Sequence, residues 1–316
     1  MNWKPKEQTE ESLYSHLKNK KLTIYQPFLG FEKQLIDEIG APKEQLGHLF
    51  LYSQKPKKPL WAKNIWQDAE IIPIDSIGDG AKKLRALGKL WVPYHHNHVR
   101  RATLIQEKLA KVSLKRLNFL EAIPKTPLGH WTLLDKDHIL ASANCSSKRP
   151  HGDWEFNEDK VNPPSRAYLK LWDLFTRLNI SPNQKETCLE LGASPGGWTW
   201  VLAPLSKKVI TFDRAPLADE IAKKFNVNHH IKDAFSVVPE DYPEVDWVFS
   251  DLICTPEKLY NWLQPWLKDK KKRKFCLTVK LKGEGNQEWI DKFSAIPESK
   301  VMHLYHNKHE LTFVLI

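Results

Sequence analysis

The stretch Leu189-Glu190-Leu191-Gly192-Ala193-Ser194-Pro195-Gly196-Gly197-Trp198 decides the fold of this 316-residue chain. It continues an apolar run that begins at Thr187 and is short enough for a buried strand. After the glycines, residues 198–203 resume as Trp-Thr-Trp-Val-Leu-Ala, which has helical spacing. A strand, a glycine-rich turn and a helix in this order form the first unit of a nucleotide-binding α/β sheet.

The glycine-rich turn favours a ligand site. Glycines let the backbone approach a ligand without interference from Cβ, and the following helix offers free N–H groups. The turn is not an NTPase phosphate loop, because no Lys-Ser or Lys-Thr follows it, and it lacks the Gly-x-Gly-x-x-Gly of dinucleotide folds. The alternative is a turn that only joins a strand to a helix.

Further strands and helices alternate after this turn, as a parallel sheet requires. The pattern predicts a Rossmann-like α/β sheet of seven strands, of which the last two form an antiparallel pair. The expected strands after the first cover residues 208–212, 227–232, 245–250, 275–280, 301–306 and 310–316, and the expected helices cover residues 217–225 and 256–267.

Charged residues follow four of these strands. Asp213 ends the second strand, where it could accept hydrogen bonds from ribose hydroxyls. Asp233 follows the third strand and could either bind an adenine amino group or cap a helix. Asp251 and Lys280 end the fourth and fifth strands. Because ligands bind at the carboxyl ends of parallel strands, we expect these side chains at one ligand-binding edge.

The string Gly-Ala-Ser-Pro-Gly-Gly-Trp resembles motif I of the FtsJ-like ribose 2′-O-methyltransferases. The resemblance implies that S-adenosylmethionine is the cofactor. It also implies a cofactor site made of Gly192, Ser194, Pro195, Gly196, Gly197, Trp198, Asp213, Asp233 and Asp251. In this interpretation Gly196 and Gly197 leave room for the methionyl part, and Asp213 holds the ribose.

The same resemblance implies a catalytic Lys-Asp-Lys-Glu tetrad of Lys170, Asp251, Lys280 and Glu310. Lys170 lies in Pro-Ser-Arg-x-x-x-Lys-Leu, which resembles the helix that precedes motif I. Asp251 lies in the family's Ser-Asp, although Leu-Ile-Cys follows it where short members carry Met-Ala-Pro. Lys280 opens a run with one residue fewer than the family's before its Gly-Glu-Gly, so Lys282 is a fallback for this position.

The chemistry of ribose methylation needs such residues. A ribose hydroxyl is a weak nucleophile, and a lysine beside a second ammonium could have its pKa lowered enough to act as a base, or it could stabilise the developing alkoxide. No metal is needed. Lys170 lies beside the apolar stripe of its predicted helix, and the alternative for it is a surface lysine with a buried stem.

Residues 1–160 are expected to form an α+β domain, and residues 161–316 the methyltransferase domain, with the boundary in the aperiodic stretch 144–164. The first domain is predicted to contain strands at 22–28 and 48–52, helices at 31–39, 81–87 and 101–109, and a hairpin over 131–143. Its strand followed by Gly-Phe-Glu-Lys, residues 30–33, resembles the opening of the enlarged bacterial large-subunit rRNA cytidine 2′-O-methyltransferases. Those enzymes add an N-terminal RNA-binding region to an FtsJ-like domain.

The basic residues are concentrated in the N-terminal half of the chain. Residues 51–116 contain 14 Lys and Arg against 5 Asp and Glu, whereas residues 161–316 contain 22 against 19. A localised basic surface suits RNA, and the alternative is a solubilising surface. His95, His96 and His98 have no nearby cysteine and no helical spacing, so they make a poor metal site. Together with Arg100 and Arg101, they suit contact with RNA.

The composition excludes several classes of protein. No apolar run approaches the length of a membrane span, and residues 1–6 lack the apolar core of a signal peptide. The four cysteines are far apart, which favours a reducing cytoplasm over a disulfide framework or a zinc ribbon. The leading hypothesis is an RNA ribose 2′-O-methyltransferase acting on large-subunit rRNA. The alternatives are methylation of another RNA such as tRNA, or an inactive RNA-binding protein with this fold.

Overall fold

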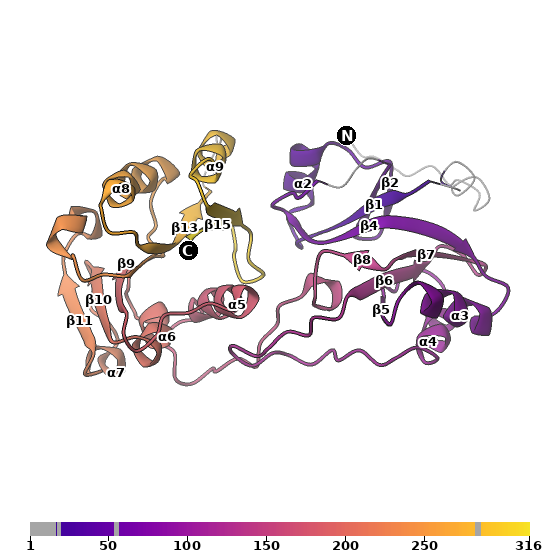
Figure 1. Ribbon diagram of the computed structural model, residues 1–316, viewed down its shortest axis with the longest axis horizontal. Helices are drawn as coiled ribbons and strands as arrows, with labels where there is room; N and C mark the ends of the chain where they lie inside the picture. The colour runs from indigo at the N-terminus through magenta and orange to yellow at the C-terminus, as the bar shows by residue number, and fades with distance from the viewer. Residues whose placement is uncertain (1–16, 18–19, 54–56, 282–285) are drawn as a thin grey trace. The chain divides into compact units, whose positions relative to one another are not determined.

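The computed structural model describes residues 17, 20–53, 57–281 and 286–316. It divides into two compact units (Figure 1). The first comprises Met1–Lys115 and Ile123–Asp153, and the second comprises Arg116–Ala122 and Trp154–Ile316. The sequence predicted a single domain boundary near residue 160, whereas the chain passes between the two units more than once. The short segment Arg116–Ala122 joins the second unit because Leu117 bridges Phe156 and Phe119 stacks on Trp172.

The first unit is built on an eight-stranded sheet with the order β2-β3-β1-β4-β7-β6-β5, and β8 pairs with β4. Its strands are β1 (Leu22–Pro27), β2 (Glu44–Leu46), β3 (Leu49–Tyr52), β4 (Ala62–Pro73), β5 (Leu90–Pro93), β6 (Leu128–Leu133), β7 (His138–Ser142) and β8 (Asn144–Cys145). All pairs are antiparallel except β5 with β6. The predicted hairpin is therefore present as β6 and β7.

Among the described residues of this unit, three helices accompany the sheet: α2 (Glu32–Ile39), α3 (Ile77–Leu87) and α4 (Val99–Gln106). Gly40 ends α2 with φ of 91°, a backbone conformation that favours glycine. The apolar faces of α3 and α4 form a core cluster with Trp91 and Trp131 of the sheet. Two short apolar stretches of the sequence, around residues 61–66 and 71–74, lie in the single long strand β4.

The second unit contains the predicted seven-stranded sheet, in the order β11-β10-β9-β12-β13-β15-β14. Its strands are β9 (Thr187–Leu191), β10 (Lys208–Asp213), β11 (Val227–Ile231), β12 (Trp247–Ser250), β13 (Lys274–Lys280), β14 (Ser299–Met302) and β15 (Glu310–Leu315). β9 to β13 run parallel, and β15 is antiparallel to both of its neighbours. The fold class expected from the sequence, a Rossmann-like methyltransferase sheet, is confirmed.

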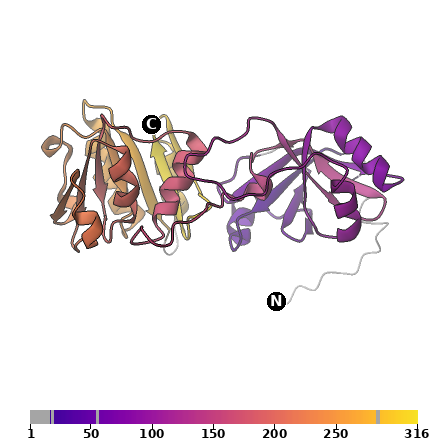
Figure 2. The same ribbon diagram turned by 90° about the horizontal axis from the view of Figure 1, so that it is seen from below.

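Helices cover both faces of this sheet. On one face lie α5 (Tyr168–Leu178), α6 (Gly197–Leu205) and α7 (Asp219–Ala222), and on the other α8 (Pro256–Lys268) and α9 (Asn286–Ser294) (Figure 1). Figure 2 shows α5 and α6 side by side across the same face. Large aromatic and aliphatic side chains from the strands and from α8 fill the main core, among them Phe212, Phe275 and Trp266.

Two helices differ from their predicted extents. α5 begins at Tyr168 rather than at the predicted Pro164-Ser165 start, because the Ser165 side chain lies against the first turn of α6. α7 is only four residues long, whereas the apolar pattern predicted a helix over residues 217–225. Phe225 contributed to that pattern but is fully exposed, so no packing extends the helix to it. Within the described ranges, no helix is long and apolar enough to cross a membrane.

Candidate active site

Lys170, Asp251, Lys280 and Glu310 meet in one ion-pair network. The Lys170 Nζ lies 3.0 Å from Asp251 Oδ2 and 2.5 Å from Glu310 Oε1. The Lys280 Nζ lies 2.5 Å from Asp251 Oδ1 and 2.5 Å from Glu310 Oε2. Each lysine therefore contacts both carboxylates. All four side chains are at least four-fifths buried, which makes this a charge-balanced cluster largely withdrawn from water.

Strand pairing brings three of these residues together. Ser250 of β12 pairs with Leu277 of β13, so Asp251 and Lys280 leave neighbouring parallel strands at the same edge. Lys280 and Glu310 are direct partners in the antiparallel pair of β13 and β15. Opposite residues of such a pair have neighbouring side chains, so the register alone places the carboxylate beside the ammonium.

Helix α5 supplies Lys170. The predicted inward stripe of this helix, which includes Leu169, Trp172 and Phe175, is buried. Lys170 lies next to that stripe and is only partly exposed, and its Nζ points to the strand ends. A lysine that only kept its stem buried would direct its ammonium to solvent. The geometry favours the tetrad assignment over that alternative.

The network changes the pKa of two of its members. Burial would raise the pKa of the Asp251 carboxyl, but Lys170 and Lys280 outweigh it and hold this pKa below its usual value. Burial would lower the pKa of the Lys280 ammonium, but Asp251 and Glu310 outweigh it and raise this pKa. The sequence argument allowed a lowered lysine pKa. The structure gives the opposite direction for the pKa of Lys280. The charges of the two carboxylates in contact with its ammonium raise this pKa, and they outweigh the effects that would lower it.

Thr278 and Asp173 support the network and were not identified from the sequence. The buried Thr278 hydroxyl donates to Asp251 Oδ1 at 2.8 Å, and it belongs to the same strand as Lys280. Asp173, one helical turn after Lys170, accepts a hydrogen bond from the Tyr305 backbone N–H at 2.7 Å and anchors the loop that leads to Glu310. Period-2 spacing before Lys280 could have indicated Thr278, whereas the contact of Asp173 with residue 305 is purely tertiary.

A cavity of about 460 Å³ adjoins the network. Its lining includes Gly192, Ser194, Asp213, Asp233 and Asp251 of the predicted cofactor residues, together with Phe235 and Lys258. The glycine turn, three strand-end carboxylates and an aromatic ring thus converge on one space. Such a lining suits a nucleoside that carries both ribose hydroxyls and an adenine ring.

The two outer carboxylates of this cavity already have partners. Asp213 accepts hydrogen bonds from the backbone N–H groups of Ser194 at 2.9 Å and Ala215 at 3.0 Å. Asp233 accepts from the Phe235 N–H at 3.0 Å and pairs with Arg214 at 2.5 Å. The predicted helix-cap role of Asp233 is therefore present, for a short 3₁₀ turn, and the residue lines the cavity as well.

The remaining motif I residues have a different position from the one expected. Within the described part of the chain, Pro195, Gly196, Gly197 and Trp198 do not line this cavity. A Cβ on Gly196, whose φ is 113°, would come within 2.9 Å of the Ile221 side chain, and a Cβ on Gly197 would come within 2.3 Å of Ser165 Oγ. Close packing between protein segments explains both glycines, not free space for the methionyl group. Only their backbone atoms remain candidates for cofactor contact.

Trp198 and Glu190 are buried parts of the same motif. Trp198 is 2% exposed, and its Nε1 donates to the Ala167 carbonyl, so its ring belongs to the core. Glu190 is fully buried in β9, where the Thr199 hydroxyl donates to its Oε2 at 2.6 Å. Burial is the main cause that raises the pKa of Glu190 to about 8. The carboxyl joins β9 to the first turn of α6, and the sequence argument had assigned it no role.

The three neighbouring histidines of the first unit lie at its surface. His95, His96 and His98 are exposed. Among the residues that the structure describes, no group of three or more His, Cys, Asp or Glu side chains could hold a metal ion. Arg100 is exposed and Arg101 is partly buried at the start of α4, where both remain available to a partner.

The comparisons with known proteins identify a family for the second unit. Residues 163–268 match the family model of the FtsJ-like methyltransferases, so the second unit contains an FtsJ-like methyltransferase domain. This match includes Lys170, the glycine-rich turn and Asp251. It confirms the resemblance deduced from motif I. Members of this family use S-adenosylmethionine.

Two curated relatives are similar to this chain, and one of them extends the similarity beyond this domain. A protein of Xanthomonas axonopodis pv. citri named "Ribosomal RNA large subunit methyltransferase M" is 26% identical over 311 residues, which is 90% of this chain and 87% of the relative. A protein of the same name from Halorhodospira halophila is 33% identical over 159 residues, which is 48% of this chain but only 46% of the relative. Both units of this chain are therefore similar to a protein of that name.

Proposed function

We propose that this protein is an S-adenosylmethionine-dependent RNA ribose 2′-O-methyltransferase that acts on large-subunit ribosomal RNA. The observation that carries the proposal is the closed network of Lys170, Asp251, Lys280 and Glu310 beside a cavity at the carboxyl ends of parallel strands. The names of the two relatives support ribosomal RNA as the substrate. The similarity across both units favours an enzyme with the same overall organisation.

The network is suited to a reaction that creates negative charge on an oxygen. When bound, the cofactor's sulfonium supplies an electrophilic methyl group. The ribose hydroxyl that attacks it develops alkoxide character, and an ammonium within hydrogen-bond reach stabilises that charge. The raised pKa of Lys280 keeps its ammonium protonated, so we assign Lys280 to orienting and stabilising the oxygen rather than to removing its proton.

The other members prepare Lys280 for this role. Asp251 and Glu310 hold both ammonium groups in place, and their charges offset the repulsion between the two lysines. Methyl transfer from a sulfonium to a hydroxyl releases one proton overall, and it leaves a neutral ether and a neutral thioether. A preformed ion-pair network needs little reorganisation as this charge moves, which lowers the barrier.

The cavity beside the network would hold the cofactor. Asp213 and Asp233 are the candidates for its ribose hydroxyls and adenine amino group, and Phe235 is a candidate for contact with the adenine ring. Asp233 would have to leave Arg214, which is possible at low cost because the Arg214 side chain is largely exposed. We also propose that the basic surface of residues 51–116 docks the RNA, and that the protein acts in the cytoplasm.

Mapping of 2′-O-methyl groups on cellular RNA, with and without this protein, tests the function. We expect one or a few ribose methyl groups of large-subunit rRNA to disappear in its absence and to return with the wild-type chain. A chain with Lys280→Ala should not restore them. Loss of methyl groups from tRNA alone would replace the proposed substrate, and unchanged maps would contradict the enzyme assignment.

A further inference from the structure

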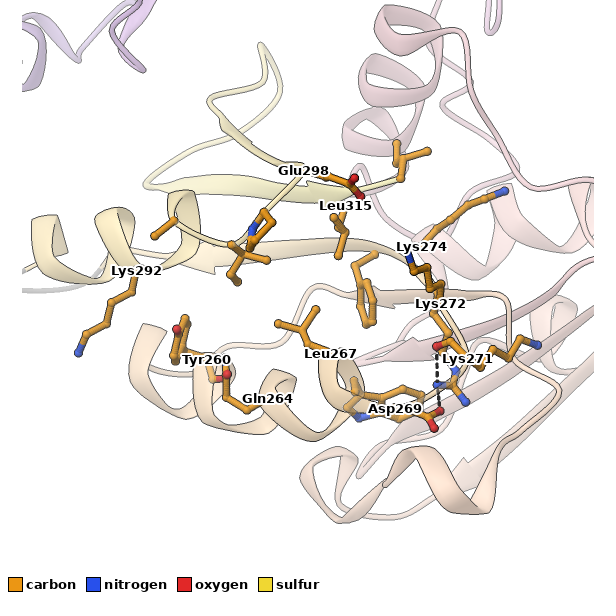
Figure 3. A pocket seen from close by; sticks show the side chains of 17 residues that line it. Tyr260, Gln264, Leu267, Asp269, Lys271, Lys272, Lys274, Lys292, Glu298 and Leu315 are labelled. Atoms are coloured by element: carbon orange, nitrogen blue, oxygen red, sulfur yellow. Dashed lines mark hydrogen bonds and ion pairs between the residues drawn. The ribbon is translucent and has the colours of Figure 1, made fainter.

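A second and larger cleft lies at the opposite end of the strands from the tetrad. It has a volume of about 700 Å³ and lies where β13 begins and β15 ends, between the C-terminal ends of α8 and α9 (Figure 3). β13 runs from Lys274 at this cleft to Lys280 at the tetrad. At about 3.3 Å per residue, the two sites are roughly 20 Å apart. The cleft is therefore separate from the cofactor cavity.

Basic side chains line two sides of this cleft, and the carboxylates Asp269 and Glu298 also lie in its lining. The loop Lys268–Lys274 has six Lys or Arg residues in seven positions, and the function proposed above makes no use of it. Lys271, Lys272 and Lys274 approach from one side and Lys292 of α9 from the other (Figure 3). Part of this charge is structural. Arg273 is buried, lies over Trp266 and pairs with Asp269, so it supports the loop and is not available to a ligand.

The four lysines remain available to an anion. Lys272 is exposed and makes no ion pair within the described residues. Lys271, Lys274 and Lys292 each pair with one carboxylate, but their side chains are about two-fifths exposed. Each also has one further contact, with the Pro243 carbonyl, the Trp247 ring and the Trp289 ring respectively. Ion pairs at such sites contribute little, typically about 0–1 kcal/mol, so a phosphate can replace the carboxylate.

The floor of the cleft is apolar and contains an aromatic ring. Tyr260, Leu267 and Leu315 lie between the two basic sides (Figure 3). An uncharged lipid or peptide would use the floor alone, and a folded duplex would use the lysines alone. An unpaired RNA segment uses both, because its phosphates contact cations while its bases lie on aromatic and apolar side chains.

We propose that this cleft is a second RNA-binding site, which holds an unpaired segment of the substrate RNA at the end of the strands opposite to the reaction. The inference rests on the proposed function. A distance of about 20 Å corresponds to about six base pairs of duplex rise, so one structured ribosomal RNA fragment can occupy the active site and the cleft together. The cleft would increase the affinity for RNA and help to position the RNA on the protein, without contact with the reacting atoms.

The test uses the double variant Lys272→Glu, Lys292→Glu and the matched control Lys207→Glu, Lys223→Glu. The control reverses two lysines that lie outside both the cleft and the cofactor cavity. The probe is large-subunit rRNA transcribed in vitro, with affinity measured over a series of salt concentrations. We expect the cleft variant to bind at least about tenfold more weakly, with a salt slope lower by about 1.4 to 1.8, since each lost phosphate contact lowers it by about 0.7 to 0.9.

Two further measurements, cofactor affinity and methylation rate, help to separate the possible outcomes. S-adenosylmethionine affinity and the methylation rate at saturating RNA should match the wild type, because the cleft is remote from the tetrad. Equal RNA affinity and salt slope in the cleft variant and the control would overturn the inference while leaving the proposed function intact. If the wild type transfers no methyl group, the proposed function fails, and the binding data still report on the cleft. Should the double variant unfold, Lys272→Ala alone provides the same comparison.

Discussion

At the scale of single residues, the tetrad shows how a cluster of charges can be stable when buried. Each lysine contacts both carboxylates, so no member is left without an opposite charge. Removal of one partner from such a set leaves an unbalanced buried charge and is strongly destabilising. Substitutions here must therefore be assessed for folding as well as for activity.

The first prediction concerns Lys280. In the Lys280→Ala protein, the stabilising ammonium is lost while the cofactor cavity keeps its lining. We expect single-turnover methyl transfer, at saturating cofactor and RNA, to fall by about 10²–10⁴-fold. Lys170→Ala should be similarly impaired. S-adenosylmethionine binding and thermal unfolding, measured beside the rates, identify any loss that is due to folding.

Lys282→Ala is the control for this experiment. Lys282 was the fallback for the third tetrad position, and it lies outside the residues that the structure describes. Because Lys280 already bonds both carboxylates, we expect Lys282→Ala to methylate RNA at close to the wild-type rate. A fully active Lys280→Ala protein beside an inactive Lys282→Ala protein would reassign the position.

The second prediction concerns Glu190 and pH. Its folded pKa, raised to about 8, lies above an unfolded value of about 4.3, so the folded chain holds a proton that the unfolded chain has lost. This group therefore lowers stability as pH rises from about 4 to 8, by at most about 1.4 kcal/mol per pH unit. Glu190→Gln removes this effect. The free energy of unfolding of the variant, relative to that of the wild type, should therefore increase from pH 5 to pH 8.

Chemical denaturation of both proteins at several pH values provides the measurement. The difference between the two curves isolates Glu190, since the histidines titrate in both proteins. Glu244→Gln, at an exposed position, should run parallel to the wild type. A difference for Glu190→Gln that stays constant with pH would mean that the carboxyl is already ionised in the folded protein.

At the scale of helices and strands, the glycines of motif I fix how α6 starts. Ser165, in the turn before α5, occupies the space that a Cβ on Gly197 would need, and the approach would be 2.3 Å. The same turn holds Trp198 through the Ala167 carbonyl. The packing of α6 against the segment that precedes α5 thus decides residue choice at a position that the sequence pattern assigned to the cofactor.

The third prediction tests this packing. Gly197→Ala should destabilise the fold by about 1–3 kcal/mol, because overpacking forces side chains or backbone to move. Ser165→Ala removes the Oγ, so the double variant Ser165→Ala, Gly197→Ala should recover part of that loss. A double-mutant cycle of unfolding free energies measures the coupling. If the two effects simply add, Ser165 does not restrict Gly197, and space for the cofactor becomes the better explanation.

At the scale of the whole molecule, charge is distributed unevenly along the chain. The basic excess of residues 51–116 is carried by the first unit, and that of the loop Lys268–Lys274 by the second. The second unit otherwise has nearly balanced charge. Counterion release at several phosphate contacts would then supply much of the RNA affinity, with a strong dependence on salt.

The fourth prediction concerns the first unit. Arg100→Glu with Arg101→Glu, at the start of α4, should weaken RNA binding and lower its salt slope, while cofactor affinity remains unchanged. The exposed Lys20→Glu with Lys43→Glu provides a control of equal charge change in the same unit. If RNA affinity and slope stay the same in the arginine variant, the basic stretch is only a solvated surface.

Much of the fold of the second unit, and the charged residues at one edge of its sheet, could be predicted from the sequence alone. Alternating strand and helix patterns predicted the seven-stranded sheet, and the residues that end β10, β12 and β13 were recognised as charged groups at one edge. Such features are local, because strand period and position in a strand follow from neighbouring residues. Motif I and the tetrad positions were recognised through their resemblance to a family, and the family match confirms that resemblance.

Other features depend on contacts between distant segments of the chain, and they became known only from the folded structure. The apolar stretches around residues 61–66 and 71–74 lie in one strand, and α5 begins at Tyr168. The segment Arg116–Ala122 belongs to the second unit. The folded structure also set the direction of the Lys280 pKa shift, through carboxylates 29 and 30 residues away. Burial and ion pairing act through space. A residue's charge environment is therefore fixed only when the chain has folded around it.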